Sequence, residues 1–194
     1  SAEQWVTAIA FTKGMFGRLD ILVNNAGIFW MKPIALETLE GFRRTQAINL
    51  DGTFLGCKHA VAALKGGRGG AIVNVGSTLG QKAGAIFTAY CASKGGVKML
   101  TQAVALHCAE QGYDIRVNGI LPGAIHTEMV EGYVAAGEAQ GASREQVLAG
   151  FASAHPMKRL GRPEEPAGAI AFLASDAASF TTGAMLPVDG GMLS

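Results

Sequence analysis

The sequence has little charge, and the charge it has is not clustered. Lysine, arginine, aspartate and glutamate make up 16% of the 194 residues, the formal net charge is +1, and no run of lysine or arginine exceeds two residues. Proteins that bind nucleic acid or an acidic membrane surface carry basic patches or runs. We therefore expect neither nucleic acid nor a membrane among the partners of this chain.

Long hydrophobic runs, cysteine clusters and histidine clusters are also missing. No apolar stretch approaches the roughly 18 residues that cross a bilayer, and the first residues, SAEQWVTAIAF, lack the basic flank of a signal peptide. The three cysteines are Cys57, Cys91 and Cys108, and their odd number argues against a disulfide framework. Their spacing is not that of metal ligands. The four histidines are scattered, so we expect no metal site. A reduced, cytoplasmic compartment fits these absences best.

Short apolar runs alternate with longer helical patterns. With 49% hydrophobic residues and 27 glycines, the chain can bury a substantial core as one domain over residues 1–194. The expected strands are Leu19–Val23, Ala71–Val75, Ile115–Leu121 and Ala184–Val188. Such runs suit a parallel sheet covered by helices on both faces, so we expect an α/β doubly wound domain. Pro187 cannot donate to a ladder and places the last strand at an edge.

Helical patterns fill the intervals between these strands, over residues 3–16 with an end near Gly17, 36–64 and 87–111. Phe54 is expected on the buried stripe of the second helix. Asparagine competes for backbone hydrogen bonds, and glycine weakens a helix, so Asn49 and Gly52 predict a kink that frees a carbonyl to hold water. The 87–111 helix is apolar or small nearly all round, so we expect one side to meet the sheet and the other a second subunit.

Three side chains between Ala71 and Lys94 can do chemistry together. Ser77 follows an apolar run, and Lys94 lies four residues after Tyr90, on the same face of a helix. A free tyrosine has a pKa of about 10, which a neighbouring cation lowers. Tyr90 would then exchange a proton with an alcohol or ketone, while Ser77 holds the substrate oxygen. The alternative is a buried tyrosine beside a lysine whose stem covers apolar surface.

The spacing of Ser77, thirteen residues before Tyr90, resembles the active site of the short-chain dehydrogenase/reductase (SDR) family. Further motifs of this family follow one another in order, namely NNAG at 24–27, INLDGTF at 48–54, N-x-x-x-P-G at 118–123 and DGG at 189–191. The resemblance covers essentially the whole chain. Within the family, the chain is similar to bacterial hydroxysteroid and cyclic secondary-alcohol dehydrogenases. It implies a Rossmann-like doubly wound parallel sheet in a single domain.

The resemblance also implies a role for each matching residue. Tyr90 is the acid/base, Lys94 lowers its pKa and binds the nicotinamide ribose, and Ser77 positions the substrate oxygen. Asn49 anchors the water of a proton relay. The implied cofactor-binding residues are Asn25, Ala26, Gly27, Tyr90, Lys94, Pro122, Gly123, Ile125 and Thr127. The candidate substrate contacts are Ser77, Leu79, Phe87 and Met129. The alternative interpretation of NNAG and of Pro122-Gly123 is that each is a turn that ends a strand.

A glycine-rich turn that could receive a pyrophosphate after a strand is not found. KGGRGG at 65–70 precedes a strand, and in GSTLGQK, which follows one, Lys82 stands where a third glycine is needed. We expect the chain to begin after the first βαβαβ portion of the family's domain. The strand Leu19–Val23 should then have an open, unpaired side.

The segment from Thr127 to Leu160 suits a mobile lid. It brings Met129, Val130, Tyr133 and Met157, and Phe29 and Trp30 are further candidate walls. The resemblance implies an NAD(P)-dependent oxidoreductase, with NAD favoured, that forms a homodimer or homotetramer. Because these side chains are apolar, we expect its substrate to be an apolar secondary alcohol or ketone. The alternatives are a catalytically silent nucleotide-binding or scaffold member of the same fold and a 3-oxoacyl thioester reductase.

Overall fold

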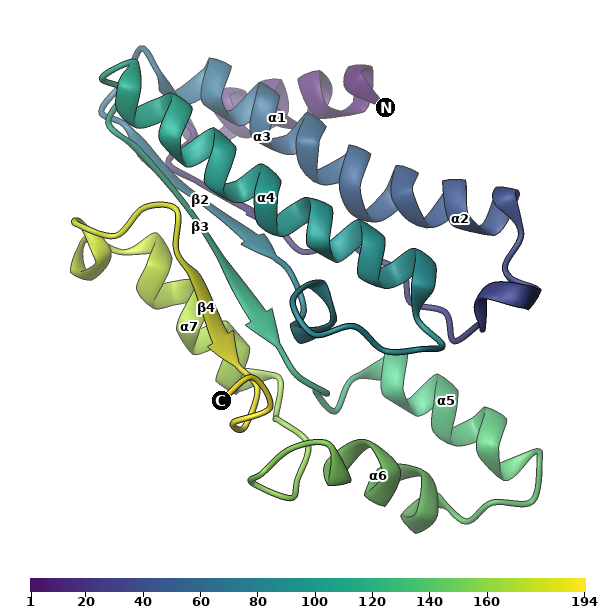
Figure 1. Ribbon diagram of the computed structural model, residues 1–194. Coiled ribbons are helices and arrows are strands. Elements are labelled where there is room, and N and C mark those ends of the chain that lie inside the picture. Colours follow the sequence, from purple (N-terminus) through teal and green to yellow (C-terminus); the bar gives the residue numbers. More distant parts are fainter.

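A computed structural model describes all residues from 1 to 194 and has a parallel sheet of four strands at its centre, in the order β1-β2-β3-β4 (Figure 1). The strands are β1 (Ile21–Asn24), β2 (Gly70–Val75), β3 (Ile115–Pro122) and β4 (Met185–Val188). In the central register, Val73 of β2 lies opposite Val23 of β1 and Asn118 of β3. The parallel sheet predicted from the apolar runs is confirmed, although β1 begins two residues later than expected.

Helices cover both faces of this sheet. The helices are α1 (Ala2–Phe16), α2 (Leu39–Gln46), α3 (Gly52–Leu64), α4 (Thr88–Glu110), α5 (Glu128–Glu138), α6 (Arg144–Ser153) and α7 (Glu164–Ala174). Short 3-10 turns lie at η1 (Ile34–Leu36), η3 (Thr78–Gly80) and η4 (Asp176–Ala178). Figure 1 shows α3 and α4 on one face and α7 on the other. No helix is both long and apolar enough to cross a bilayer.

The alternation of side chains along β2 divides the core in two. Ile72 packs with Leu64 of α3 and Cys108 of α4, whereas Val73 packs with Leu173 of α7. Successive residues of a strand point to opposite faces, so a strand buried on both faces is mostly apolar. The buried exception in β2 is Asn74, whose side chain is hydrogen-bonded to Asn24 and Thr101. The doubly wound α/β class follows from this arrangement.

The helix expected over residues 36–64 is interrupted where Asn49 and Gly52 predicted a kink. A π-helical segment, η2 (Ala47–Asp51), joins α2 to α3. The hydroxyl of Thr53 donates to the Asn49 carbonyl at 2.8 Å, so the carbonyl expected to hold water already has one partner inside the helix. Placing Phe54 on the buried stripe of α3 was wrong: Phe54 is 48% exposed, whereas Thr53, Cys57 and Leu64 are buried.

Both edges of the sheet match the sequence predictions. β4 is an edge strand and contains Pro187. β1 is the other edge strand, and no segment of this chain pairs with its outer side, as expected for this strand. The helix that precedes β1 ends at Gly17, whose φ of 79° is left-handed and suits a residue without a side chain.

The segment predicted to be a lid forms the helices α5 and α6. They follow β3 and lie beyond the carboxyl ends of the strands (Figure 1). α6 begins with a capping box in which Ser143 and Gln146 bond each other's backbone N–H groups. This position places two helices over the end of the sheet where the functional motifs gather.

Candidate active site

A cavity of about 940 Å³ opens at the carboxyl ends of β1, β2 and β3. Its wall includes Asn25 after β1, Ser77 after β2 and Gly123 after β3, and residues of α5 and α6 close a further side. Ligands of open parallel sheets bind in the crevice at this end of the strands. The motifs singled out in the sequence therefore surround one space.

Ser77, Tyr90 and Lys94 all line this cavity. Ser77 is buried, and its hydroxyl accepts the backbone N–H of Leu79 at 3.1 Å. The ammonium of Lys94 donates to the Val75 carbonyl at 2.8 Å and lies 5.8 Å from the centre of the Tyr90 ring. Four-residue spacing on α4 thus places the lysine beside the tyrosine, as predicted.

Burial has a large effect on the pKa values of both Tyr90 and Lys94. Desolvation raises the pKa of Tyr90 to about 12, and the nearby Ser77 hydroxyl offsets only part of this. Desolvation also lowers the pKa of Lys94 to about 8. Lys94 is not among the groups that shift the pKa of Tyr90 in this geometry, so its effect on that pKa stays a prediction.

Asn49 lies behind the cavity wall. Its side-chain oxygen accepts the backbone N–H of Ile28 at 2.8 Å, and its amide donates to the Ile28 carbonyl at 2.9 Å and to the Ser93 hydroxyl at 3.0 Å. Ser93 in turn donates to the Tyr90 carbonyl at 2.8 Å. Asn49 and Ser93 therefore join the turn after β1 to the first turn of α4, which carries Tyr90.

Most of the residues assigned to the cofactor by resemblance line the same cavity. These are Asn25, Gly27, Tyr90, Lys94, Pro122, Gly123, Ile125 and Thr127. Ala26 is the exception: it does not line the cavity and its side chain is exposed. Ala26 lies between Asn25 and Gly27, which both line the cavity.

One backbone group in the loop after β3 is left for a ligand. The N–H of Ala124 is bonded by a side chain, and the N–H of His126 donates to the Gly161 carbonyl at 2.8 Å. The N–H of Ile125, between them, has no partner within the chain. Polar backbone groups are almost always paired when buried, so this donor at the cavity wall fits an amide or carbonyl oxygen of a bound molecule.

The chain matches a family model described as Enoyl-(Acyl carrier protein) reductase over residues 1–193. It is 38% identical over 198 residues to the 3-beta-hydroxysteroid dehydrogenase of Comamonas testosteroni, a match that covers 100% of this chain and 74% of that one. The chain belongs to the short-chain dehydrogenase/reductase family. The resemblance seen in the sequence motifs is confirmed.

Other comparisons agree with this assignment to the SDR family. The chain is 46% identical over 177 residues to the cis-4-hydroxycyclohexanecarboxylate dehydrogenase of Sinomonas cyclohexanicum, covering 91% of this chain and 66% of that one. It superposes on the ligand-free aldohexose dehydrogenase of Thermoplasma acidophilum with a TM-score of 0.91 and 33% identity, covering 100% and 75% of the two chains. The structure titled "ElxO with NADP Bound" gives a TM-score of 0.89 at 33% identity, with 100% and 75% covered. This SDR chain thus spans about two thirds to three quarters of the length of these relatives.

An aromatic cluster forms the far wall of the cavity in this SDR. The ring of Phe29 stacks on Phe87 at 5.3 Å between centres and meets Tyr90 edge-on at 4.8 Å and Tyr133 edge-on at 5.2 Å. The Tyr133 hydroxyl donates to the Phe29 carbonyl at 3.0 Å. Edge-to-face pairs add stability beyond their buried area. Phe29 therefore connects α5 to Tyr90.

The predicted substrate contacts Ser77, Leu79, Phe87 and Met129 all line the cavity, as do Val130 and Tyr133. Two further candidates do not. Trp30 is 47% exposed outside the cavity, and Met157 is 59% exposed and lines a neighbouring, smaller cavity.

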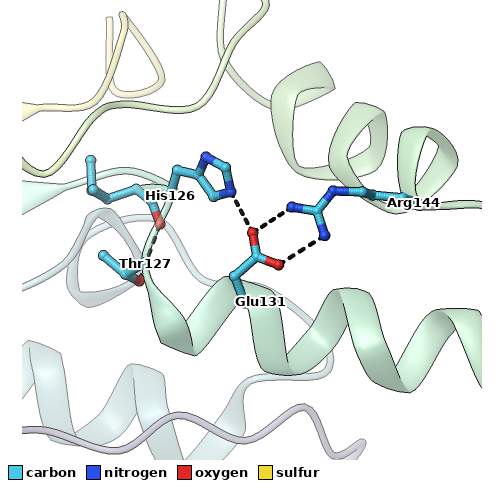
Figure 2. Close-up of polar contacts among 5 residues, drawn as sticks. His126, Thr127, Glu131 and Arg144 are labelled. Atoms are coloured by element: carbon cyan, nitrogen blue, oxygen red, sulfur yellow. Dashed lines mark hydrogen bonds and ion pairs between the residues drawn. The ribbon is translucent and has the colours of Figure 1, made fainter.

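An ion-pair network holds the two lid helices together (Figure 2). Glu131 of α5 accepts two bonds from the guanidinium of Arg144 on α6, at 2.6 and 2.9 Å, and also contacts the His126 ring. Arg144 and His126 hold the pKa of Glu131 at about 2. Because His126 stands between Ile125 and Thr127, the network ties the lid to the loop at the cavity wall.

Sequence reasoning missed several groups that build this site. Ser93, Phe151 and Arg144 carried no motif, and their partners lie far away in the chain. The four histidines were set aside because no metal-ligand spacing linked them, and no group of acidic, histidine and cysteine side chains that could hold a metal is found. All three cysteines are free.

Proposed function

We propose that this SDR chain carries the catalytic centre of an NAD(P)-dependent oxidoreductase that interconverts a secondary alcohol and a ketone. The observation that supports it most directly is the convergence of Ser77, Tyr90 and Lys94 on one cavity wall, across from the loop that bears the unpaired Ile125 N–H. The curated relatives named above are dehydrogenases. A catalytically silent relative would have no need to keep these groups together.

Tyr90 and Ser77, in the cavity wall, have different roles in the proposed reaction. The Tyr90 hydroxyl exchanges a proton with the substrate oxygen, and the Ser77 hydroxyl hydrogen-bonds the same oxygen and holds it in place. The nicotinamide cofactor, when bound, accepts or supplies the hydride. Since the pKa of Tyr90 is about 12, the phenol is protonated at neutral pH. In this geometry Tyr90 is ready to donate a proton to a ketone, and it must first lose that proton to act as the base in oxidation of an alcohol.

The loop after β3 and the turn after β1 would hold the nicotinamide end of the cofactor. Ile125 offers its N–H to the carboxamide, with Thr127 and Pro122 beside it, while Asn25 and Gly27 lie across the cavity. The buried ammonium of Lys94 would contact the ribose. The cofactor is NAD or NADP: a relative from Lentilactobacillus kefiri, 36% identical, is named as an NADP-dependent (R)-specific alcohol dehydrogenase, and ElxO is described with NADP bound.

The substrate we propose is an uncharged, apolar ketone or secondary alcohol. Phe29, Phe87, Tyr133 and Phe151 form an aromatic wall, and Lys94 is the one lysine, arginine, aspartate or glutamate in the lining. Because that ammonium is committed to the Val75 carbonyl, a carboxylate on the substrate would find no free cation. Burying an unpaired charge is costly. Cyclohexanols without a carboxylate should therefore be better substrates than 4-hydroxycyclohexanecarboxylate.

The test is an activity assay that follows the absorbance of the nicotinamide cofactor. The substrates are a panel of cyclic alcohols and ketones, with and without a carboxylate. Tyr90→Phe should lower kcat by about 100-fold or more, the range of general acid catalysis, while its cofactor affinity stays close to that of the unsubstituted protein. Tyr113→Phe is the matched control, since that ring packs against His107 away from the cavity. Equal rates for Tyr90→Phe and the unsubstituted protein would rule out the assigned acid/base.

A further inference from the structure

The loop that bears the Ile125 N–H is held from behind by the segment 155–161. The Gly161 N–H donates to the Ala124 carbonyl at 2.9 Å, and the Gly161 carbonyl accepts the His126 N–H at 2.8 Å. The third bond comes from a side chain: the Ala124 N–H donates to the Nε2 of His155 at 3.0 Å. These bonds take up the donors on either side of Ile125, whose own N–H has no partner within the chain. Ile125 itself lines the cavity.

The imidazole of His155 is held in one protonation state by its two partners. The ring is buried, with 3% of the residue exposed. Its Nδ1 lies 3.0 Å from the Phe151 carbonyl, which can only accept a hydrogen bond. The Ala124 N–H can only donate. The proton must therefore be on Nδ1 and Nε2 must be bare, so the ring is neutral.

His155 packs closely against the loop at Gly123. A Cβ at position 123 would lie 2.4 Å from Nε2 and 3.1 Å from the Asp189 Cα, so glycine at 123 is what allows the ring to reach Ala124. On its other side the ring is bonded to Phe151, in the last turn of the lid helix α6. His155 thus connects the lid to the loop.

We propose that His155 is a positioning residue for cofactor binding, whose neutral Nδ1–H imidazole fixes the Ala124 peptide so that the Ile125 N–H points at the cofactor. The inference rests on the proposed function, because it assigns the Ile125 N–H to the nicotinamide carboxamide. It goes beyond that function by giving His155, which also lines the cavity, a role that acts through the Ala124 peptide. Through Phe151, the same imidazole couples the position of α6 to the shape of the cofactor site.

Two substitutions of His155, by the longer amide glutamine and the shorter amide asparagine, distinguish this role from a purely structural one. In His155→Gln the side-chain oxygen reaches the position of Nε2 and can accept the Ala124 N–H. In His155→Asn the amide reaches only the position of Nδ1, so the contact with Phe151 is kept and the contact with Ala124 is lost. His107→Asn, at an exposed position on α4, is the matched control.

The measurements are the dissociation constant of the nicotinamide cofactor, the KM of the ketone and the melting temperature of each variant. We expect His155→Asn to weaken cofactor binding by about tenfold or more, as for a buried N–H left unpaired. His155→Gln should stay within about threefold of the unsubstituted protein, and His107→Asn should not differ from it. The KM of the ketone should change less than the cofactor affinity in His155→Asn.

Histidine ring ¹⁵N spectra of the unsubstituted protein give a second readout that needs no substitution. They should show a neutral His155 protonated on Nδ1 at pH 7; an Nε2–H tautomer or a charged ring would overturn the inference. Normal cofactor binding by His155→Asn would also overturn it while leaving the proposed function intact. Failure of the unsubstituted protein to bind either NAD or NADP would overturn the proposed function, and the inference with it.

Discussion

At Tyr90, two effects on the phenol oppose each other. A cation four residues away favours the phenolate, and the loss of water around the ring favours the phenol. The second effect is larger, because the pKa rises to about 12. Spacing along the chain indicates which side chains are neighbours, but it does not indicate how much water each of them loses.

The rates in the two directions should therefore depend on pH in opposite ways. Oxidation of an alcohol needs the phenolate, whose population below a pKa of about 12 grows about tenfold per pH unit. We expect the oxidation rate to rise from pH 6 to 8, because Tyr90 is still protonated throughout this range. Reduction, which uses the neutral phenol, should stay level from pH 6 to 8.

Initial rates in both directions, at saturating cofactor, would measure this dependence. Tyr90→Phe is the control, because its residual rate should lose the rise with pH. An oxidation rate that does not change between pH 6 and 8 would contradict the raised tyrosine pKa.

Individual residues differ in how far the sequence reveals them. Ser77, Tyr90 and Lys94 were predictable because a strand end and one helix face bring them together at fixed spacing. His155 was not, because both of its partners are backbone groups, Ala124 and Phe151, which any sequence supplies. Side chains that bond backbone leave no pattern of residue types to detect.

At the scale of elements, the kink between α2 and α3 was visible in the sequence, and the connection between α5 and α6 was not. Asparagine and glycine in mid-helix are locally unfavourable, so they indicate an interruption. The Glu131–Arg144 pair joins two helices across thirteen positions and a turn (Figure 2). Its geometry depends on how α5 and α6 pack, which periodicity does not specify.

Glu131→Gln should loosen the lid. The variant loses both charged bonds to Arg144, so we expect faster amide exchange across α5 and α6 and a higher KM for the ketone. Because the pair is partly exposed, salt should raise the KM of the unsubstituted protein and leave that of the variant nearly unchanged.

The ion pair should also depend on pH. The pKa of Glu131 is about 2, against 4.5 for the free group, so the ion pair is intact above about pH 4.5 and is lost only as the pH falls toward 2.

Hydrogen exchange and KM at low and high salt would check this prediction. Glu110→Gln, at the end of α4 and outside the ion pairs of the structure, is the matched control. If the KM of the unsubstituted protein does not respond to salt, the ion pair has no part in holding the lid.

At the scale of the whole molecule, the sequence indicated both the fold and a surface that the fold leaves uncovered. The apolar runs of β2 and β3 required helices on both faces, and α3, α4 and α7 supply them. The helix expected to be buried on two sides, α4, meets the sheet on one side only. Its other side carries an exposed stripe that includes Met99 at 62% and Leu106 at 63% exposure.

We propose that this stripe packs against the same stripe of a second copy, giving a homodimer or one half of a homotetramer. A two-fold axis lets Met99 and Leu106, seven positions apart on one face of α4, meet their counterparts in the other subunit. Charge at the centre of such an interface is unfavourable, so Leu106→Glu should shift the protein toward monomers in sedimentation velocity. Gln140→Glu, exposed in the turn between α5 and α6, adds the same charge elsewhere and should leave the sedimentation coefficient unchanged. A monomeric unsubstituted protein, or a Leu106→Glu variant that sediments with it, would show that α4 is exposed in solution as it is in the single chain.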